Sequence, residues 1–141
     1  MNKKSVCMSF DYTEDKNYRN LLQAWNVNPN FQFNIDDKTP GEIDTWDIGR
    51  IKAVLTTKIK SADYMLVIIG RKSNSPHPDR TQIGQKNWQI WEIEKAKEFN
   101  KKIVAVKIDS AFESPDSLYN CGVKWAFSFS KEQIINKLNE L

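Results

Sequence analysis

Tyr64-Met65-Leu66-Val67-Ile68-Ile69 is a continuous apolar run, and Gly70 closes it. Runs of this kind are typical of a central parallel strand, because helices cover both of its faces and leave no polar side. The segment therefore predicts the middle strand of a sheet that carries a helical layer on each side.

Strand and helix patterns alternate around this run. Apolar runs and alternating apolar residues predict further strands at 6–10, 31–35, 103–108 and 124–129. Helical spacing predicts helices at 17–25, 45–60 and 88–99, and the capping pattern of Ser130 and Gln133 predicts one more at the C-terminus. We expect one α/β domain over 1–141, a flavodoxin-like three-layer fold with five mainly parallel strands in the order 2-1-3-4-5.

Composition argues against several classes of function. The 141 residues include 21 Lys or Arg and 18 Asp or Glu, giving a net charge of +3 with no basic stripe, so we expect neither nucleic-acid nor membrane binding. Cys7, Cys121 and His77 are too few and too scattered for a metal site or a disulfide framework. No run approaches the roughly 20 apolar residues of a membrane span or resembles a signal peptide, so the expected location is cytoplasmic.

The predicted topology also locates a ligand site. Open parallel sheets bind ligands outside the carboxyl ends of their strands, near the point where the winding reverses. Four segments share this position: Phe10-Asp11, Asp36-Asp37, Gly70-Arg71 and the helix start at Trp88. The long polar segment 73–86 precedes that helix and is a candidate lid.

Three common occupants of this architecture do not fit the crevice. A dinucleotide-binding Rossmann domain needs a glycine-rich turn after its first strand, but no glycine precedes Gly41. The segment 9–12 is too bulky for the phosphate loop of a flavodoxin. A response-regulator receiver needs an aspartate after the third strand, where this chain has Gly70-Arg71.

Six segments together form a pattern of another kind: Ser9-Phe10, 33–36, 66–70, 88–93, 101–106 and 122–125. In order and spacing they resemble the TIR family, and in particular the bacterial TIR-like proteins of the Thoeris antiphage system. The resemblance extends over about residues 4–138. It implies the TIR-like version of the flavodoxin-like fold.

The resemblance implies that Glu92 is catalytic. Enzymatic TIR domains cleave NAD at the nicotinamide ribose with a glutamate four residues after a helical tryptophan, and Trp88 and Glu92 match this spacing. Cleavage of an N-glycosidic bond develops positive charge on the ribose, which a carboxylate stabilises. The alternative is that Trp88 and Trp91 are core residues and Glu92 is a solvated acid near Lys95 or Lys97.

Nucleotide-binding roles follow for further residues, each beside a structural alternative. Phe10 and Asp11 match the pocket lining, or they are a core ring and a helix cap. Trp46 could stack on nicotinamide or adenine, or fix the approach of the chain to its helix. Arg71 could bind the pyrophosphate, or extend into water.

Two positions near the outer strands complete the candidate set. Asp36, with Asp37, lies at the predicted crevice, but the pair could equally form an Asx-turn before Pro40. Trp125 matches a tryptophan near the last strand of the family, or it is an ordinary core aromatic.

The resemblance as a whole implies an antiphage-defence enzyme of the NAD glycohydrolase or ADP-ribosyl cyclase kind. NAD is its substrate and no cofactor is permanently bound; a cyclic or conjugated ADP-ribose product would activate a separate effector. A phage-derived trigger and self-association complete the expected partners, although the segments 37–45 and 73–86 depart from the family pattern. The alternatives are a non-catalytic protein-interaction module and a nucleotide sensor without turnover.

Overall fold

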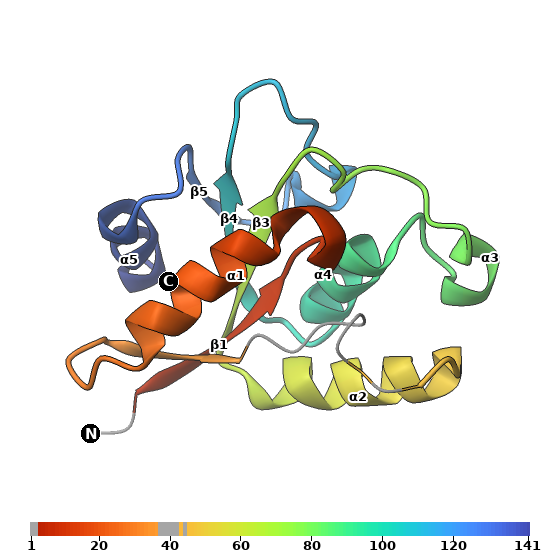
Figure 1. Ribbon diagram of the computed structural model, residues 1–141, viewed down its shortest axis with the longest axis horizontal. Coiled ribbons are helices and arrows are strands. Elements are labelled where there is room, and N and C mark those ends of the chain that lie inside the picture. Colours follow the sequence, from red (N-terminus) through yellow and green to blue (C-terminus); the bar gives the residue numbers. More distant parts are fainter. Residues whose placement is uncertain (1–2, 37–42, 44) are drawn as a thin grey trace.

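The computed structural model describes residues 3–36, 43 and 45–141, and its centre is a parallel sheet (Figure 1). Five strands form this sheet: β1 Lys4–Ser9, β2 Phe33–Asp36, β3 Tyr64–Ile69, β4 Lys102–Lys107 and β5 Lys124–Ala126. Every neighbouring pair is parallel, and the order is β2-β1-β3-β4-β5. The predicted α/β class and strand order are confirmed.

Helices connect these strands: α1 Tyr12–Asn26, α2 Ile48–Ser61, α3 Arg80–Ile83, α4 Trp88–Glu98, the 3₁₀ turn η2 Asp116–Leu118 and α5 Lys131–Asn139. Side-chain caps set several helix starts. Ser130 accepts a hydrogen bond from the Gln133 backbone N–H, as the capping pattern predicts. The first helix begins five residues before the predicted start, because Asp11 Oδ1 accepts from the Glu14 N–H. No helix among the described residues has the length and apolarity needed to cross a membrane.

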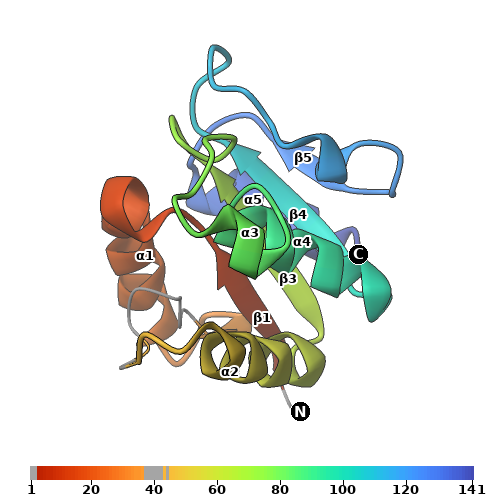
Figure 2. The same ribbon diagram turned by 90° about the vertical axis from the view of Figure 1, so that its right-hand side faces the viewer.

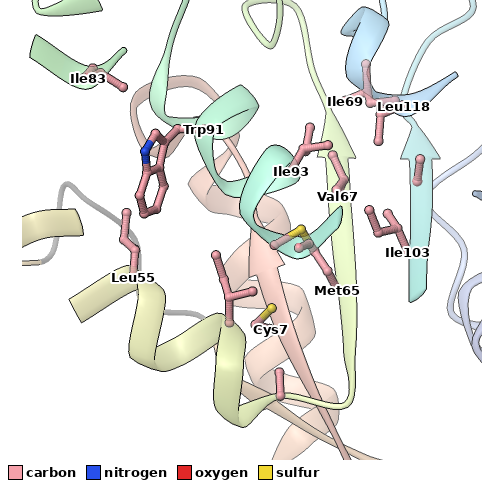
Figure 3. Close-up of a cluster of buried hydrophobic side chains, with 14 of the residues drawn as sticks. Cys7, Leu55, Met65, Val67, Ile69, Ile83, Trp91, Ile93, Ile103 and Leu118 are labelled. Atoms are coloured by element: carbon pink, nitrogen blue, oxygen red, sulfur yellow. The ribbon is translucent and has the colours of Figure 1, made fainter. Parts of the chain in front are cut away.

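Helices cover both faces of the sheet (Figures 1 and 2). On one face, α2 and α4 pack Leu55 and Ile93 against alternate strand residues such as Met65 and Val67 (Figure 3). On the other, α1 and α5 pack their apolar sides against the intervening strand residues. Residues 65–69 are therefore completely buried, which explains why the sequence of β3 shows no polar alternation.

The segment between β3 and α4 is tied to the body of the domain. The Gly70 N–H donates to Ser73 Oγ at 2.9 Å, and Asn87 Nδ2 donates to the Ser73 carbonyl at the same distance. Within the segment, α3 places Ile83 in the core at 1% exposure. These contacts anchor both ends and the middle of the candidate lid, whose movement stays a prediction.

The winding of the chain reverses between β1 and β3. These strands are neighbours in the sheet, but the chain leaves β1 into α1 on one face and leaves β3 toward α4 on the opposite face. Their carboxyl ends, at Ser9 and Ile69, therefore lie at the position where such sheets bind ligands.

Candidate active site

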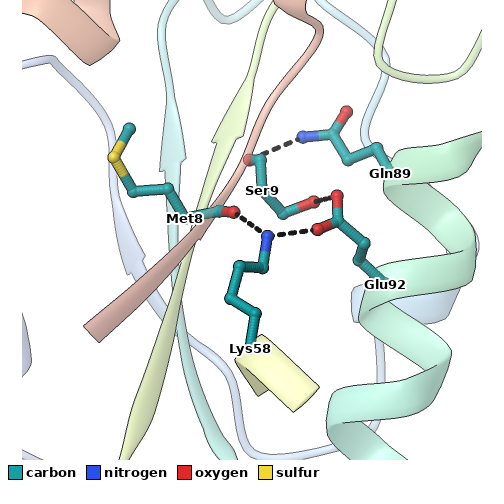
Figure 4. Close-up of polar contacts among 5 residues, drawn as sticks. All are labelled: Met8, Ser9, Lys58, Gln89 and Glu92. Carbon is teal, nitrogen blue, oxygen red and sulfur yellow. Dashed lines mark hydrogen bonds and ion pairs between the residues drawn. The ribbon is translucent and has the colours of Figure 1, made fainter. Parts of the chain in front are cut away.

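The Glu92 carboxylate lies against the carboxyl end of β1 (Figure 4). Its Oε1 accepts a hydrogen bond from Ser9 Oγ at 3.0 Å, and its Oε2 accepts from Lys58 Nζ at 2.5 Å. Lys58 Nζ also donates to the Met8 carbonyl at 3.0 Å. Three elements, β1, α2 and α4, thus converge on one carboxylate.

This position rules out the solvated alternative for Glu92, whose exposed fraction is 0%. The neighbouring lysines pair elsewhere on α4: Lys95 with Glu98 and Lys97 with Glu94, both at i,i+3 spacing. The interpretation of Glu92 as a surface acid near those lysines is therefore wrong. The carboxylate faces the sheet, at the strand end that the ligand argument selects.

Burial sets the protonation chemistry of Glu92. Removal from water raises the pKa of its carboxyl above the ordinary value, because the charged form loses hydration. The Lys58 ammonium and the Ser9 hydroxyl oppose this rise by stabilising the carboxylate. A charged Glu92 in this site therefore depends on its partners.

Gln89 lies one turn before Glu92 and ties α4 to the sheet. Its Nε2 donates to the carbonyls of Ser9 and Ile68, at 3.1 and 2.8 Å. Because two carbonyls fix the amide nitrogen, the orientation of the amide is determined. Among the described residues, its buried Oε1 finds no hydrogen-bond donor.

The sequence analysis missed Gln89, Ser9 and Lys58 as parts of this site. A lysine is normally expected on the solvated side of a helix, but the structure buries Lys58 on the apolar face of α2. The signal was present: position 58 follows Ile51 by seven residues and Leu55 by three, which is the spacing of the buried face. A lysine at such a position predicts a buried anionic partner.

A second buried acid, Asp15 of α1, lies against Gly70 at the end of β3 and is 5% exposed. A Cβ added to Gly70 would lie 2.0 Å from Asp15 Oδ2, so a glycine is required there. Burial, and then the carboxylates of Asp11 and Glu14, raise the pKa of Asp15 to about 6, and Arg71 opposes them. Oδ2 has no hydrogen-bond partner among the described residues.

Asp15→Asn is expected to change how stability depends on pH. A carboxyl with a raised pKa in the folded state stabilises the fold fully below its unfolded value of 3.8, and this contribution is lost as the pH rises through about 6. Between about pH 4 and pH 7.5 the wild type should lose up to about 3 kcal/mol relative to Asp15→Asn. Urea unfolding at a series of pH values measures the difference, and two parallel curves would contradict it.

Asp11 and Arg71 lie near Asp15, and Phe10 lies in the core on the same face of the sheet. Phe10 is 3% exposed and belongs to the core cluster on the α1 side, while Asp11 caps α1. Arg71 Nη2 contacts both carboxylate oxygens of Glu14 at 3.0 Å, with its own side chain 66% exposed. The guanidinium is therefore exposed to solvent, where it pairs with Glu14.

The four other candidate positions are spread more widely. Trp88 starts α4, is half-buried, and meets Trp91 edge-on at 5.8 Å between ring centroids. Trp46 is 99% exposed just before α2. Trp125 stacks between Tyr119 and Phe127 on β5, with β4 and β3 between it and β1. Trp125 is therefore remote from Glu92 in the sheet, whereas Trp88 precedes Glu92 by about one turn of α4.

Asp36 is the last residue of β2, and its Cα pairs with that of Cys7 on β1. This strand end is adjacent to the end of β1, as the predicted order requires. Its companion Asp37 lies outside the described residues.

Solved structures share this fold at low sequence identity. The CMP N-glycosidase BcmB of Clostridium botulinum is 15% identical, with a TM-score of 0.57 over 96% of this chain and 99% of its own. The 2-desoxiribosyltransferase of Leishmania mexicana is 14% identical, with a TM-score of 0.57 over 97% of both chains. A prokaryotic SEFIR domain is 15% identical, with a TM-score of 0.56 over 98% of this chain and 95% of its own.

Sequence comparison is more specific than these structural likenesses. No curated protein matches the chain significantly. The profile of the family described as "Thoeris protein ThsB, TIR-like domain" matches residues 8–113, a range that runs from the last two residues of β1 through β4 and includes both buried acids. With most of the chain matched and the sheet order in agreement, this protein belongs to the family of Thoeris ThsB TIR-like domains that its sequence resembles.

Proposed function

We propose that this TIR-like domain is an enzyme of antiphage defence that cleaves NAD at the nicotinamide ribose, with Glu92 as its catalytic carboxylate. One observation carries the proposal: Glu92 lies four residues after Trp88 on α4 and directs its carboxylate to the end of β1, beside the reversal of winding. That is the position where open parallel sheets bind nucleotides.

The names of two structural neighbours support this class of chemistry. One is a CMP N-glycosidase and the other a 2-desoxiribosyltransferase, so both names refer to reactions at the sugar of a nucleoside. At such low identity the likeness shows a common fold, and the link to NAD rests on the family and on Glu92 itself.

In the proposed reaction the bond between the ribose C1 and the nicotinamide nitrogen breaks, and its electron pair leaves with nicotinamide. The oxocarbenium-like ribose is stabilised by the negative charge of Glu92. Water at C1 gives ADP-ribose, an internal hydroxyl or an adenine nitrogen gives a cyclic product, and a second small molecule gives a conjugate. We propose that this product is released in the bacterial cytoplasm and activates a separate effector.

Substrate must reach a carboxylate that has no exposed surface in this structure. Oε2 is held by a buried ammonium, whereas Oε1 is held by the Ser9 hydroxyl, which can turn about a single bond. The productive state therefore opens the site on the Ser9 side and presents Oε1 to the ribose. A trigger that acts by assembly or binding would favour that open state.

The same burial favours a second candidate function. A glutamate sealed in an ion pair with Lys58 is also what a structural role would require. In that case the domain binds a nucleotide or a protein partner without turnover, and its surface carries the function.

The test follows nicotinamide and adenine-containing products from NAD by chromatography and mass spectrometry. Wild type should release nicotinamide at high protein concentration or in lysate from phage-infected cells, and Glu92→Gln should lower the rate about 10²–10³-fold. The control is Glu94→Gln, which changes a half-exposed acid of the same helix and should keep the wild-type rate. Equal rates for wild type and Glu92→Gln, or no product from any sample, would support the non-catalytic candidate.

A further inference from the structure

Lys58 stands out among the described lysines because its ammonium is buried. Its side chain is 2% exposed, and it extends from the apolar face of α2 toward the end of β1. The ammonium binds Glu92 Oε2 at 2.5 Å and the Met8 carbonyl at 3.0 Å (Figure 4). The backbone contact fixes the ammonium relative to the strand, independently of α4.

Burying this pair is costly, since each ion loses its hydration, and an apolar pair of similar volume would fill the same space. Structural stability alone is therefore a weak reason for a lysine here. The carboxylate that it contacts is the one that the proposed reaction needs in its charged form.

The two partners of Glu92 hold different oxygens. Lys58 holds Oε2 and Ser9 holds Oε1, so the plane of the carboxylate is fixed from two sides. If Ser9 turns away, the contact with Lys58 still determines where Oε1 points. An ammonium bonded to the strand can serve as this reference because the Met8 carbonyl belongs to β1 and not to α4.

We propose that Lys58 is a positioning residue for Glu92: it holds Oε2, keeps the carboxylate charged, and leaves Oε1 to face the ribose. The proposal rests on the proposed function, because it assigns a role in that reaction. The groups that face Glu92 are Lys58 from α2 and Ser9 from β1, and on its own helix Gln89 is turned to the sheet carbonyls.

The direct test compares Lys58→Met with Lys60→Met, which removes an exposed charge from the same helix. In Lys58→Met, kcat for nicotinamide release near neutral pH should fall at least about tenfold, with little change in KM. The acid limb of its pH profile should move upward by at least about one pH unit, because an unpaired buried carboxyl retains its proton. Lys60→Met should match the wild type.

An unchanged midpoint in Lys58→Met would overturn the proposal, since a packing defect lowers activity without moving the pH profile. Lys58→Gln is a second charge-removing variant that keeps a polar group, and it should show the same shift. If it retains both the wild-type rate and the wild-type midpoint, the positioning role is likewise wrong.

A second measurement needs no activity and so separates the two proposals. The unfolding free energies of wild type, Glu92→Gln, Lys58→Met and the double variant are measured by urea unfolding against pH. Without Lys58, the contribution of Glu92 should go on being lost to higher pH than in the wild type, because burial then raises the pKa of the acid without the opposing ammonium. If this shift is seen and no NAD is cleaved, Lys58 keeps Glu92 charged but the proposed enzymatic function is wrong. If the unfolding free energy depends on pH in the same way with and without Lys58, Lys58 does not keep Glu92 charged.

Discussion

Glu92→Leu is expected to lower the free energy of unfolding by about 3–5 kcal/mol, because it leaves the Lys58 ammonium buried without its anion. Lys58→Met should cost less, because a Glu92 carboxylate left without its cation can take up a proton and become neutral. The double variant replaces the ion pair by two apolar side chains, and should recover to within about 1–2 kcal/mol of the wild type. Urea unfolding at neutral pH measures all four proteins.

The matched control is the Glu94–Lys97 pair, which lies on the surface of the same helix, α4. Its N–O distance is 3.4 Å and its side chains are 38% and 34% exposed, so Glu94→Leu should cost no more than about 1 kcal/mol. If Glu92→Leu costs no more than Glu94→Leu, the buried pair contributes nothing beyond a surface contact. Glu92→Gln also leaves Lys58 without its anion, so the activity assay with this variant should be run below its unfolding temperature.

Gly70→Ala is expected to destabilise the protein by about 1–3 kcal/mol, because the new methyl group would lie 2.0–2.5 Å from the carboxylate atoms of Asp15. The short, buried Asp15 side chain has little room to turn away. Truncating it should relieve the clash, so the effect of Gly70→Ala should be much smaller in an Asp15→Ala background. Thermal and urea unfolding of the four proteins give this coupling energy.

Gly49→Ala is the control for a glycine substitution, since among the described residues its new methyl group would meet Asp47 Oδ1 alone, at 3.2 Å. Its effect should stay within about 1 kcal/mol. Additive costs for Gly70→Ala and Asp15→Ala would show that the two residues do not touch.

The fold could be predicted because its signals are local or periodic. The unbroken apolar run of β3 needs helices on both faces, and the alternation of strands and helices then leaves few arrangements of a parallel sheet. Helix ends were predicted less well. The polar residues after β1 favour a turn, but in the structure Asp11 caps α1 and these residues form its first turn.

The candidate site could be predicted only in part. Glu92 was found through its spacing from Trp88 and the family resemblance, whereas its partners come from strands and helices 34 and 83 residues away. Such contacts are set by tertiary packing, which no local pattern encodes. Asp15 was missed for a related reason, since it can be buried there only because Gly70 has no side chain.

The Lys58–Glu92 pair also limits the routes by which the chain can diverge. A descendant that abandons the proposed reaction gains nothing by losing the glutamate alone, because the orphaned lysine would unfold a fraction of its molecules. Replacement of the lysine first is therefore less harmful, because the remaining acid becomes neutral and can later be replaced by an apolar residue. Domains of this family that have become silent should then carry neither charge, and those with a lysine but no acid should be the rarest.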